Sequence, residues 1–169
     1  MVHKYKTDAN NQFLRVKSRI CPHGFKQIEG LHYDKKKVAS PTAHLPDVLL
    51  FLATTCQENM HLRHYDVKSA FSIPELKERI VMKFPVGMNK LKGKTVLLKN
   101  SLNGLKQAAR NWYDKAHEFM TKEGFKRNTI QPCLYTRWTR GKLCMVCLYV
   151  DNFNVASADL DELDQFRKT

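Results

Sequence analysis

The sequence predicts an α+β fold, and three observations support this prediction. Short stretches that alternate polar and apolar residues recur along the chain, as expected of half-buried strands. Other segments place apolar residues at the spacing of one helix face. The 43% hydrophobic and 10% aromatic content of the 169 residues is typical of a folded chain, and this length suffices for one sizeable core. We therefore expect a single domain, or part of one.

The first elements are expected to be a basic hairpin and a buried helix. Two alternating stretches within residues 4–20 flank the turn formers at residues 8–11, which predicts a β-hairpin. A charged loop leads into residues 48–57, where we expect a helix. Four of its apolar residues suit burial under a sheet: Leu49, Leu50, Leu52 and Ala53.

Strands and a second helix follow in the middle of the chain. Alternation predicts strands at residues 61–67, 80–84 and 95–99, with a basic turn at 90–94. The first of these strands ends near Asp66. The apolar stripe of residues 112–123 predicts a helix, and Gly124 suits the left-handed cap after it.

The last part of the chain holds its most hydrophobic segment. Residues 143–150 are almost continuously apolar, which is typical of a central strand. Asp151 and Asn152, which tolerate left-handed backbone geometry, end this strand, and apolar residues resume at 153–156, so we expect a hairpin here. A strand at 134–137 precedes it and an acidic helix at 159–168 follows.

The charge balance points to a polyanionic partner. Lys and Arg number 29 against 16 Asp and Glu, a net charge of +13, and such a field attracts nucleic acid. A basic surface that only keeps the protein soluble, or a fragment separated from acidic segments, stays open as an alternative.

The cysteines and the hydropathy indicate the cellular compartment in which the protein is expected. Five Cys without regular spacing predict a reducing, intracellular compartment, either cytoplasm or nucleus. No apolar run reaches membrane-helix length. Cys144 and Cys147 have metal-site spacing, but residues three apart on a strand point to opposite faces, so we expect buried thiols instead.

Two carboxylates stand out as candidate catalytic groups. Asp66 follows a strand, and Asp151 ends the most hydrophobic strand. Burying a carboxylate there costs free energy unless it has a binding partner. If these strands are neighbours, the two carboxylates converge, as two-metal phosphoryl transfer with Mg²⁺ requires. Two ordinary strand-end aspartates are the alternative.

Several ordered motifs resemble those of copia-type retrotransposon reverse transcriptases. Residues 64–71, His-Tyr-Asp-Val-Lys-Ser-Ala-Phe, resemble the motif of the first metal-binding Asp, and residues 149–152, Tyr-Val-Asp-Asn, the Tyr-Val-Asp-Asp turn. Residues 99–113 are similar to the Leu-Tyr-Gly-Leu-Lys-Gln-x-Pro-Arg-x-Trp signature. Residues 17–33 resemble the fingers segment, and 75–82 with 85–87 continue the similarity, which covers nearly the whole chain.

The resemblance implies a polymerase palm-and-fingers fold with an antiparallel sheet packed on helices, truncated before the thumb. It implies one reverse transcriptase-like domain fragment over residues 1–169, fingers-like to about residue 45 and palm-like with interspersed fingers elements from about 46. The implied activity is RNA-directed DNA polymerase. Asp66 and Asp151 would bind Mg²⁺ or Mn²⁺, with Asn152 in a degenerate third position.

The resemblance also implies nucleotide-binding residues and partners. Lys17 and Arg19 would hold the incoming triphosphate, and Phe71 would exclude a 2′-hydroxyl. The signature would line the nucleotide pocket with Asn103, Gly104, Lys106 and Gln107. The implied partners are an RNA template, a DNA primer, a dNTP and other parts of a Pol polyprotein; the oligomeric state stays open.

Departures from the family pattern predict weak or absent activity. Asn152 stands where the family has its third catalytic Asp, Asn103 replaces a Tyr, and Ala109 replaces a Pro. The resemblance begins at Met1 and ends soon after the catalytic hairpin, without thumb or RNase H. A non-catalytic nucleic-acid-binding remnant is therefore the alternative function, and a relic that never folds stably is a further one.

Overall fold

The computed structural model describes residues 1–84 and 93–166, so the Pro85–Gly87 similarity and part of the expected turn at 90–94 lie outside the described residues. The chain divides into two compact units. The hairpin unit comprises Met1–Ala39 and Phe71–Asn111, and the sheet unit comprises Ser40–Ala70 and Trp112–Thr169. The expected division into fingers-like and palm-like parts stays a prediction.

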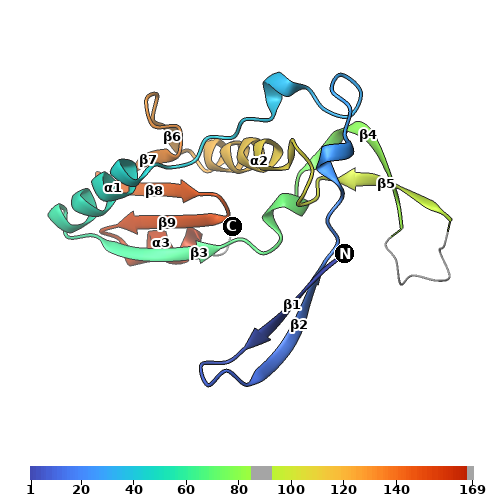
Figure 1. The fold of residues 1–169 in the computed structure, drawn as a ribbon. Coiled ribbons are helices and arrows are strands. Elements are labelled where there is room, and N and C mark those ends of the chain that lie inside the picture. The colour runs from blue at the N-terminus through green and yellow to red at the C-terminus, as the bar shows by residue number, and fades with distance from the viewer. Residues whose placement is uncertain (85–92, 167–169) are drawn as a thin grey trace. The chain divides into compact units, whose positions relative to one another are not determined.

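The hairpin unit opens with the two-stranded hairpin that the sequence predicts. Strands β1 (Val2–Thr7) and β2 (Phe13–Arg19) pair antiparallel, and Figure 1 shows them as a blue ribbon pair. The turn forms because the Asp8 carboxylate accepts hydrogen bonds from the backbone N–H groups of Asn10 and Gln12, both at 2.9 Å. Two 3₁₀ helices follow, η1 (Gly24–Lys26) and η2 (Lys35–Lys37).

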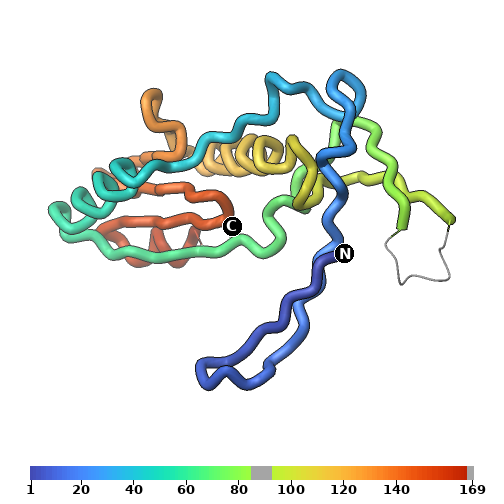
Figure 2. Tube along the Cα trace, in the orientation of Figure 1, coloured from blue at the N-terminus to red at the C-terminus, as the bar shows by residue number. Residues whose placement is uncertain are grey.

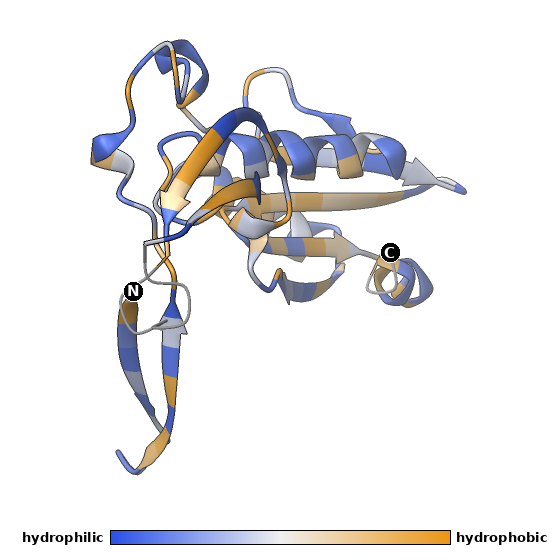
Figure 3. Cartoon of the chain, turned by 90° about the vertical axis from the view of Figure 1, so that its right-hand side faces the viewer, coloured by the Kyte–Doolittle hydropathy of each residue, from blue (hydrophilic) through white to orange (hydrophobic). Residues whose placement is uncertain are grey.

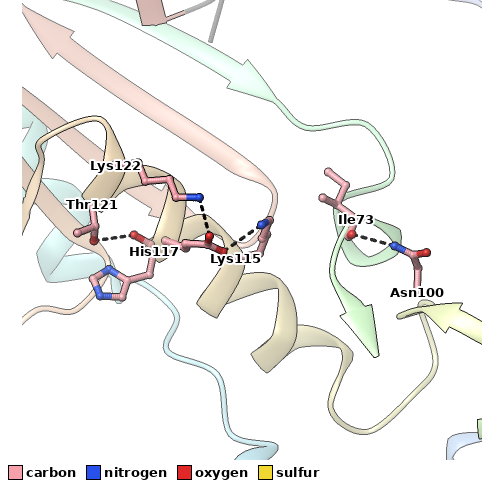
Figure 4. A network of polar contacts seen from close by, with 7 residues as sticks. Ile73, Asn100, Lys115, His117, Thr121 and Lys122 are labelled. Carbon is pink, nitrogen blue, oxygen red and sulfur yellow. Dashed lines mark hydrogen bonds and ion pairs between the residues drawn. The ribbon is translucent and has the colours of Figure 1, made fainter. Parts of the chain in front are cut away.

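A second strand pair in the hairpin unit carries its small core. Strands β4 (Glu75–Lys83) and β5 (Thr95–Asn100) pair antiparallel, both longer than expected, after the 3₁₀ helix η3 (Ala70–Ser72). The Asn100 amide donates to the carbonyl oxygen of Ile73 at 3.0 Å (Figure 4). The core cluster is formed by buried Ile80, Leu105 and Ala108, with Phe71, Leu76 and Leu98 packed against it.

The sheet unit is built on a five-stranded antiparallel sheet in the order β3-β9-β8-β7-β6 (Figures 1 and 2). Its strands are β3 (His61–Asp66), β6 (Lys126–Arg127), β7 (Leu134–Thr139), β8 (Lys142–Tyr149) and β9 (Asn152–Ser157). The prediction that residues 143–150 form a central strand is confirmed, because β8 lies in the middle and Cys144–Leu148 are all buried. The short β6 was not expected.

Residues on opposite faces of this sheet have different surroundings. Directly paired residues of antiparallel strands share a face, so Tyr65 and its partner Phe153 point the same way. That face packs on helices, because the Phe153 ring contacts Trp112 at 6.4 Å and Phe166 at 5.9 Å. The next row, Asp66 with its partner Asn152, therefore lies on the other face.

Three α-helices are present among the described residues: α1 (Leu45–Gln57), α2 (Ala108–Lys122) and α3 (Leu160–Phe166). None is long and apolar enough to cross a membrane. Helix α2 begins four residues before the apolar stripe, because alanine is the best helix former and two of them precede the stripe. Gly124 follows with φ +78°, as expected of a left-handed cap. On the surface of α2, Lys115 and Lys122 both pair with Glu118 (Figure 4).

The expected burial of α1 is wrong, although the helix itself is confirmed. Its buried residues are Asp47, Phe51 and Thr55, which recur every four positions and form a single narrow face. The four residues expected inside, Leu49, Leu50, Leu52 and Ala53, are all exposed. The Asp47 carboxylate is buried because it caps the helix, accepting a hydrogen bond from the His44 N–H at 2.9 Å.

Candidate active site

The two candidate catalytic aspartates lie side by side at one end of the sheet. Asp66 is the last residue of β3 and pairs with Asn152, the first residue of β9. The backbone N–H of Val67 donates to the carbonyl oxygen of Asp151 at 2.9 Å, which fixes the end of β3 against the β8–β9 turn. Asp66 is exposed and Asp151 is half-buried. The two strands are not neighbours as expected, because β9 lies between β3 and β8; Asp66 comes close to Asp151 through its pairing with the next residue, Asn152.

The turn between β8 and β9 contains a strained residue. Tyr149 pairs with Asn152, so Val150 and Asp151 are the two loop residues. Val150 has φ +56°, whereas we expected Asp151 or Asn152 to take the left-handed geometry. This position of a two-residue hairpin usually holds Gly, and a β-branched residue there is a genuine outlier. Such strain persists only where the surrounding structure enforces it.

Trp112 supplies part of that enforcement. Its side chain is buried on α2, and the indole N–H donates to the carbonyl oxygen of Val150 at 2.6 Å. The sequence placed residue 112 on the apolar stripe of a helix, which is correct, but gave no indication of the Trp112 hydrogen bond to the turn. The available signal was chemical, because a buried indole N–H needs an acceptor. Trp112 is therefore a positioning residue for Asp151.

The third position of the site carries no charge. The Asn152 amide Nδ2 donates to Asp151 Oδ1 at 3.4 Å, a contact that an aspartate could not make. Across the described residues, no group of three or more His, Cys, Asp and Glu side chains is placed to hold a metal ion. The candidate oxygen donors are therefore two carboxylates and one amide.

The residues expected to bind the nucleotide all lie in the hairpin unit. Lys17 and Arg19 are exposed on β2. Phe71 is half-buried in η3 and packs on the core cluster. Asn103 and Lys106 are exposed, with the Lys106 ammonium 5.2 Å from the centroid of the Tyr33 ring. Their nucleotide contacts stay predictions.

Gly104 and Gln107 have a clear structural role in the hairpin unit. Gly104 has φ +114°, and a Cβ on it would lie 2.7 Å from the carbonyl oxygen of Pro22, so only glycine fits. A Cβ on Gly24 would lie 2.2 Å from the Gly104 oxygen. The two loops thus touch through their backbones, far apart in sequence.

The Gln107 amide forms hydrogen bonds with the segment that follows Gly24. It is buried, and its Nε2 donates to the carbonyl oxygen of His32 at 2.9 Å and to Glu78 Oε2 at 3.3 Å. Its Oε1 accepts from Gln27 Nε2 at 2.9 Å, and Gln27 Oε1 accepts from the Lys106 N–H at 2.8 Å. The signature segment is therefore held by the amide side chains of Gln27 and Gln107.

Three of the five cysteines behave as apolar core residues. All five are free, and Cys133, Cys144 and Cys147 are buried. Burial raises the pKa of the Cys133 and Cys147 thiols to about 11 and that of Cys144 to about 12. The prediction that Cys144 and Cys147 are buried thiols is confirmed.

The chain is similar to retrotransposon polyproteins. It is 31% identical over 94% of its length to a retrovirus-related Pol polyprotein from transposon TNT 1-94 of Nicotiana tabacum, of which it covers 12%. It is 29% identical over 72% of its length to the transposon Ty1-BL Gag-Pol polyprotein of Saccharomyces cerevisiae, of which it covers 7%. No solved structure matches the chain.

A family model supports the same assignment. The model for reverse transcriptase (RNA-dependent DNA polymerase) matches residues 1–169. This match includes the paired strands of Asp66 and Asn152 and the signature held by Gln107. The chain belongs to the reverse transcriptase family, as a domain of the copia-type retrotransposon kind.

Proposed function

We propose that the chain is the nucleotidyl-transfer region of an RNA-directed DNA polymerase whose site is built on Asp66 and Asp151. The single observation that carries this proposal is the register that pairs Asp66 with Asn152, beside Asp151. The reaction would extend a DNA primer on an RNA template, with a dNTP as substrate. The chain spans 12% of its tobacco relative, so the activity of a whole polyprotein is not carried over.

The residues of the site fit Mg²⁺ or Mn²⁺, with one charge fewer than three carboxylates would give. Hard divalent cations prefer oxygen ligands, and Asp66 and Asp151 offer carboxylate oxygens from adjoining backbone positions. Bound divalent ions would neutralise the triphosphate and lower the pKa of the primer hydroxyl. Asp66 would bind from the open face of β3, and Asp151 from a turn that Trp112 holds in place.

The hairpin unit would supply the nucleotide contacts. Lys17 and Arg19 are exposed cations on the β1–β2 strand pair, suited to bind triphosphate oxygens. Phe71 is fixed by its packing on the core cluster, so its ring could lie against a sugar without a loss of side-chain freedom. Gln107 would act by positioning the signature segment, because its amide is fully engaged inside the unit.

The test compares the native chain with Asn152→Asp and Asp66→Asn for Mn²⁺ binding and primer extension. A unit charge about 4 Å from another contributes about 4 kcal/mol near a protein surface, and about 1.4 kcal/mol is a factor of ten. We therefore expect Asn152→Asp to raise metal affinity at least roughly tenfold, and Asp66→Asn to abolish extension. Asn154→Asp adds the same charge two residues along β9, on the same face of the sheet, and should change both quantities much less.

The outcomes separate the candidate functions. Extension by Asn152→Asp that disappears on adding Asp66→Asn supports the proposal. If neither protein binds Mn²⁺ nor extends a primer, while both bind nucleic acid, the polymerase assignment of this site is wrong.

A further inference from the structure

The β1–β2 hairpin sorts its side chains by charge. Pairing places three rows on one face: Val2 with Arg19, Lys4 with Lys17, and Lys6 with Arg15. Residues directly opposite each other share a face, and so do residues two apart on a strand. Five cations therefore share one face of a strand pair.

The other face of the hairpin carries its apolar and aromatic side chains, beside the polar pair of His3 and Ser18. Tyr5 pairs with Val16, and the Tyr5 and Phe13 rings lie 6.1 Å apart. Figure 3 shows the resulting alternation of hydrophilic and hydrophobic bands along both strands. All residues of both strands are exposed, so neither face is covered by the rest of the hairpin unit.

The cationic face has no internal counter-charge. Within the described residues, none of its five cations lies within ion-pair distance of a carboxylate. Asp8 is the only acidic residue in the first 20, and its carboxylate oxygen is engaged by the turn N–H groups. Lys4 faces Lys17 and Lys6 faces Arg15, arrangements that destabilise an isolated strand pair.

We propose that Lys4, Lys6 and Arg15 bind the sugar-phosphate backbone of a nucleic-acid single strand, on the face that also carries Lys17 and Arg19. The three rows are about 6.7 Å apart along the strands, so the face spans about 13 Å. An external row of phosphates would offset the cross-strand repulsion.

This site does not depend on the carboxylates or on a metal ion. Binding through phosphates is electrostatic and independent of sequence, and it releases counterions. Nucleic-acid binding by this face should therefore persist in EDTA and in the Asp66→Asn variant. Loss of polymerase activity and loss of this binding can thus be told apart.

The test is fluorescence anisotropy with a labelled oligodeoxythymidylate in EDTA, from about 50 to 200 mM salt. Each neutralised phosphate on a single strand contributes about 0.7 to the slope of log K against log salt. The triple variant Lys4→Gln, Lys6→Gln, Arg15→Gln should therefore lower the magnitude of the slope by about 2, and weaken binding at the lowest salt by tenfold or more.

Two controls keep the test decisive. A second triple variant, Lys77→Gln, Lys126→Gln and Arg140→Gln, removes the same charge from exposed positions elsewhere and should retain the native slope. The double variant Lys4→Arg, Lys6→Arg keeps the charge and should bind like the native chain, whether or not the Gln variant folds.

Two outcomes overturn the proposal. One is an equal change of slope in both triple variants, because net charge alone would then explain the binding. The other is hairpin-dependent binding to vesicles of phosphatidylserine and phosphatidylcholine without binding to the oligonucleotide, because the amphipathic hairpin would then recognise a lipid surface.

Discussion

The strain at Val150 predicts that Val150→Gly stabilises the protein. A non-glycine residue in a sparsely populated backbone region costs about 1–3 kcal/mol, and Val150 has φ +56°. Against this, glycine loses about 0.5–1 kcal/mol more backbone entropy on folding, and the Val150 side chain, 38% exposed, loses part of its burial. The expected net gain in the free energy of unfolding is about 1 kcal/mol.

Thermal or urea unfolding measures this change. For a chain of this length, about 1 kcal/mol corresponds to a rise of about 2–4 °C in Tm. Val81→Gly is the matched control, because Val81 is 50% exposed in the regular strand β4 and loses stability on the same substitution. If Val150→Gly destabilises the protein as much as Val81→Gly does, the turn is not strained and the reasoning is wrong.

Two further predictions concern the core of the sheet unit. Trp112→Phe removes the hydrogen bond to the β8–β9 turn and some core volume, so it should cost about 2–3 kcal/mol of unfolding free energy in urea titrations. Exposed Trp138→Phe should change this free energy by less than about 0.5 kcal/mol, and equal effects would contradict the role of the bond. Because burial raises the pKa of the Cys133, Cys144 and Cys147 thiols to about 11–12, both states keep these protons below pH about 9 and the unfolded state loses them first above it. Stability should therefore fall from about pH 9 toward 11, by up to about 1.4 kcal/mol per pH unit and thiol, and Cys144→Ala should reduce the slope; a native profile without this fall would contradict the burial argument.

Local patterns in the sequence predict most of the strands and helices. The hairpin at residues 1–20, the central strand β8 and the cap at Gly124 follow from turn chemistry, from an apolar run and from backbone freedom. These three features depend on residues close in sequence. Asp66 and Asp151 were expected on neighbouring strands, but β9 lies between β3 and β8, and Asp66 instead pairs with Asn152, the residue after Asp151.

The features that sequence reasoning missed depend on long-range contacts. The apolar stretch of α1 indicates a helix but not which of its faces meets the sheet, so Leu49 and its neighbours were placed inside. The close approach of Gly24 to Gly104 and the amide network of Gln107 join segments about 80 residues apart. The left-handed geometry of Val150 is imposed by strand register and by Trp112, against its local preference.

The structure separates what Asn152 contributes to the fold from what it removes from the site. Its backbone pairs with both Asp66 and Tyr149, and a strand ladder does not depend on the side-chain charge. Asparagine has the shape of aspartate, so the register that pairs Asp66 with residue 152 is kept. The charge is lost, and the new amide donor lies 3.4 Å from an oxygen of Asp151, where it competes with a cation for that oxygen. Loss of metal affinity without loss of fold is therefore the expected consequence of this substitution, and a single amide-to-carboxylate replacement is expected to reverse it.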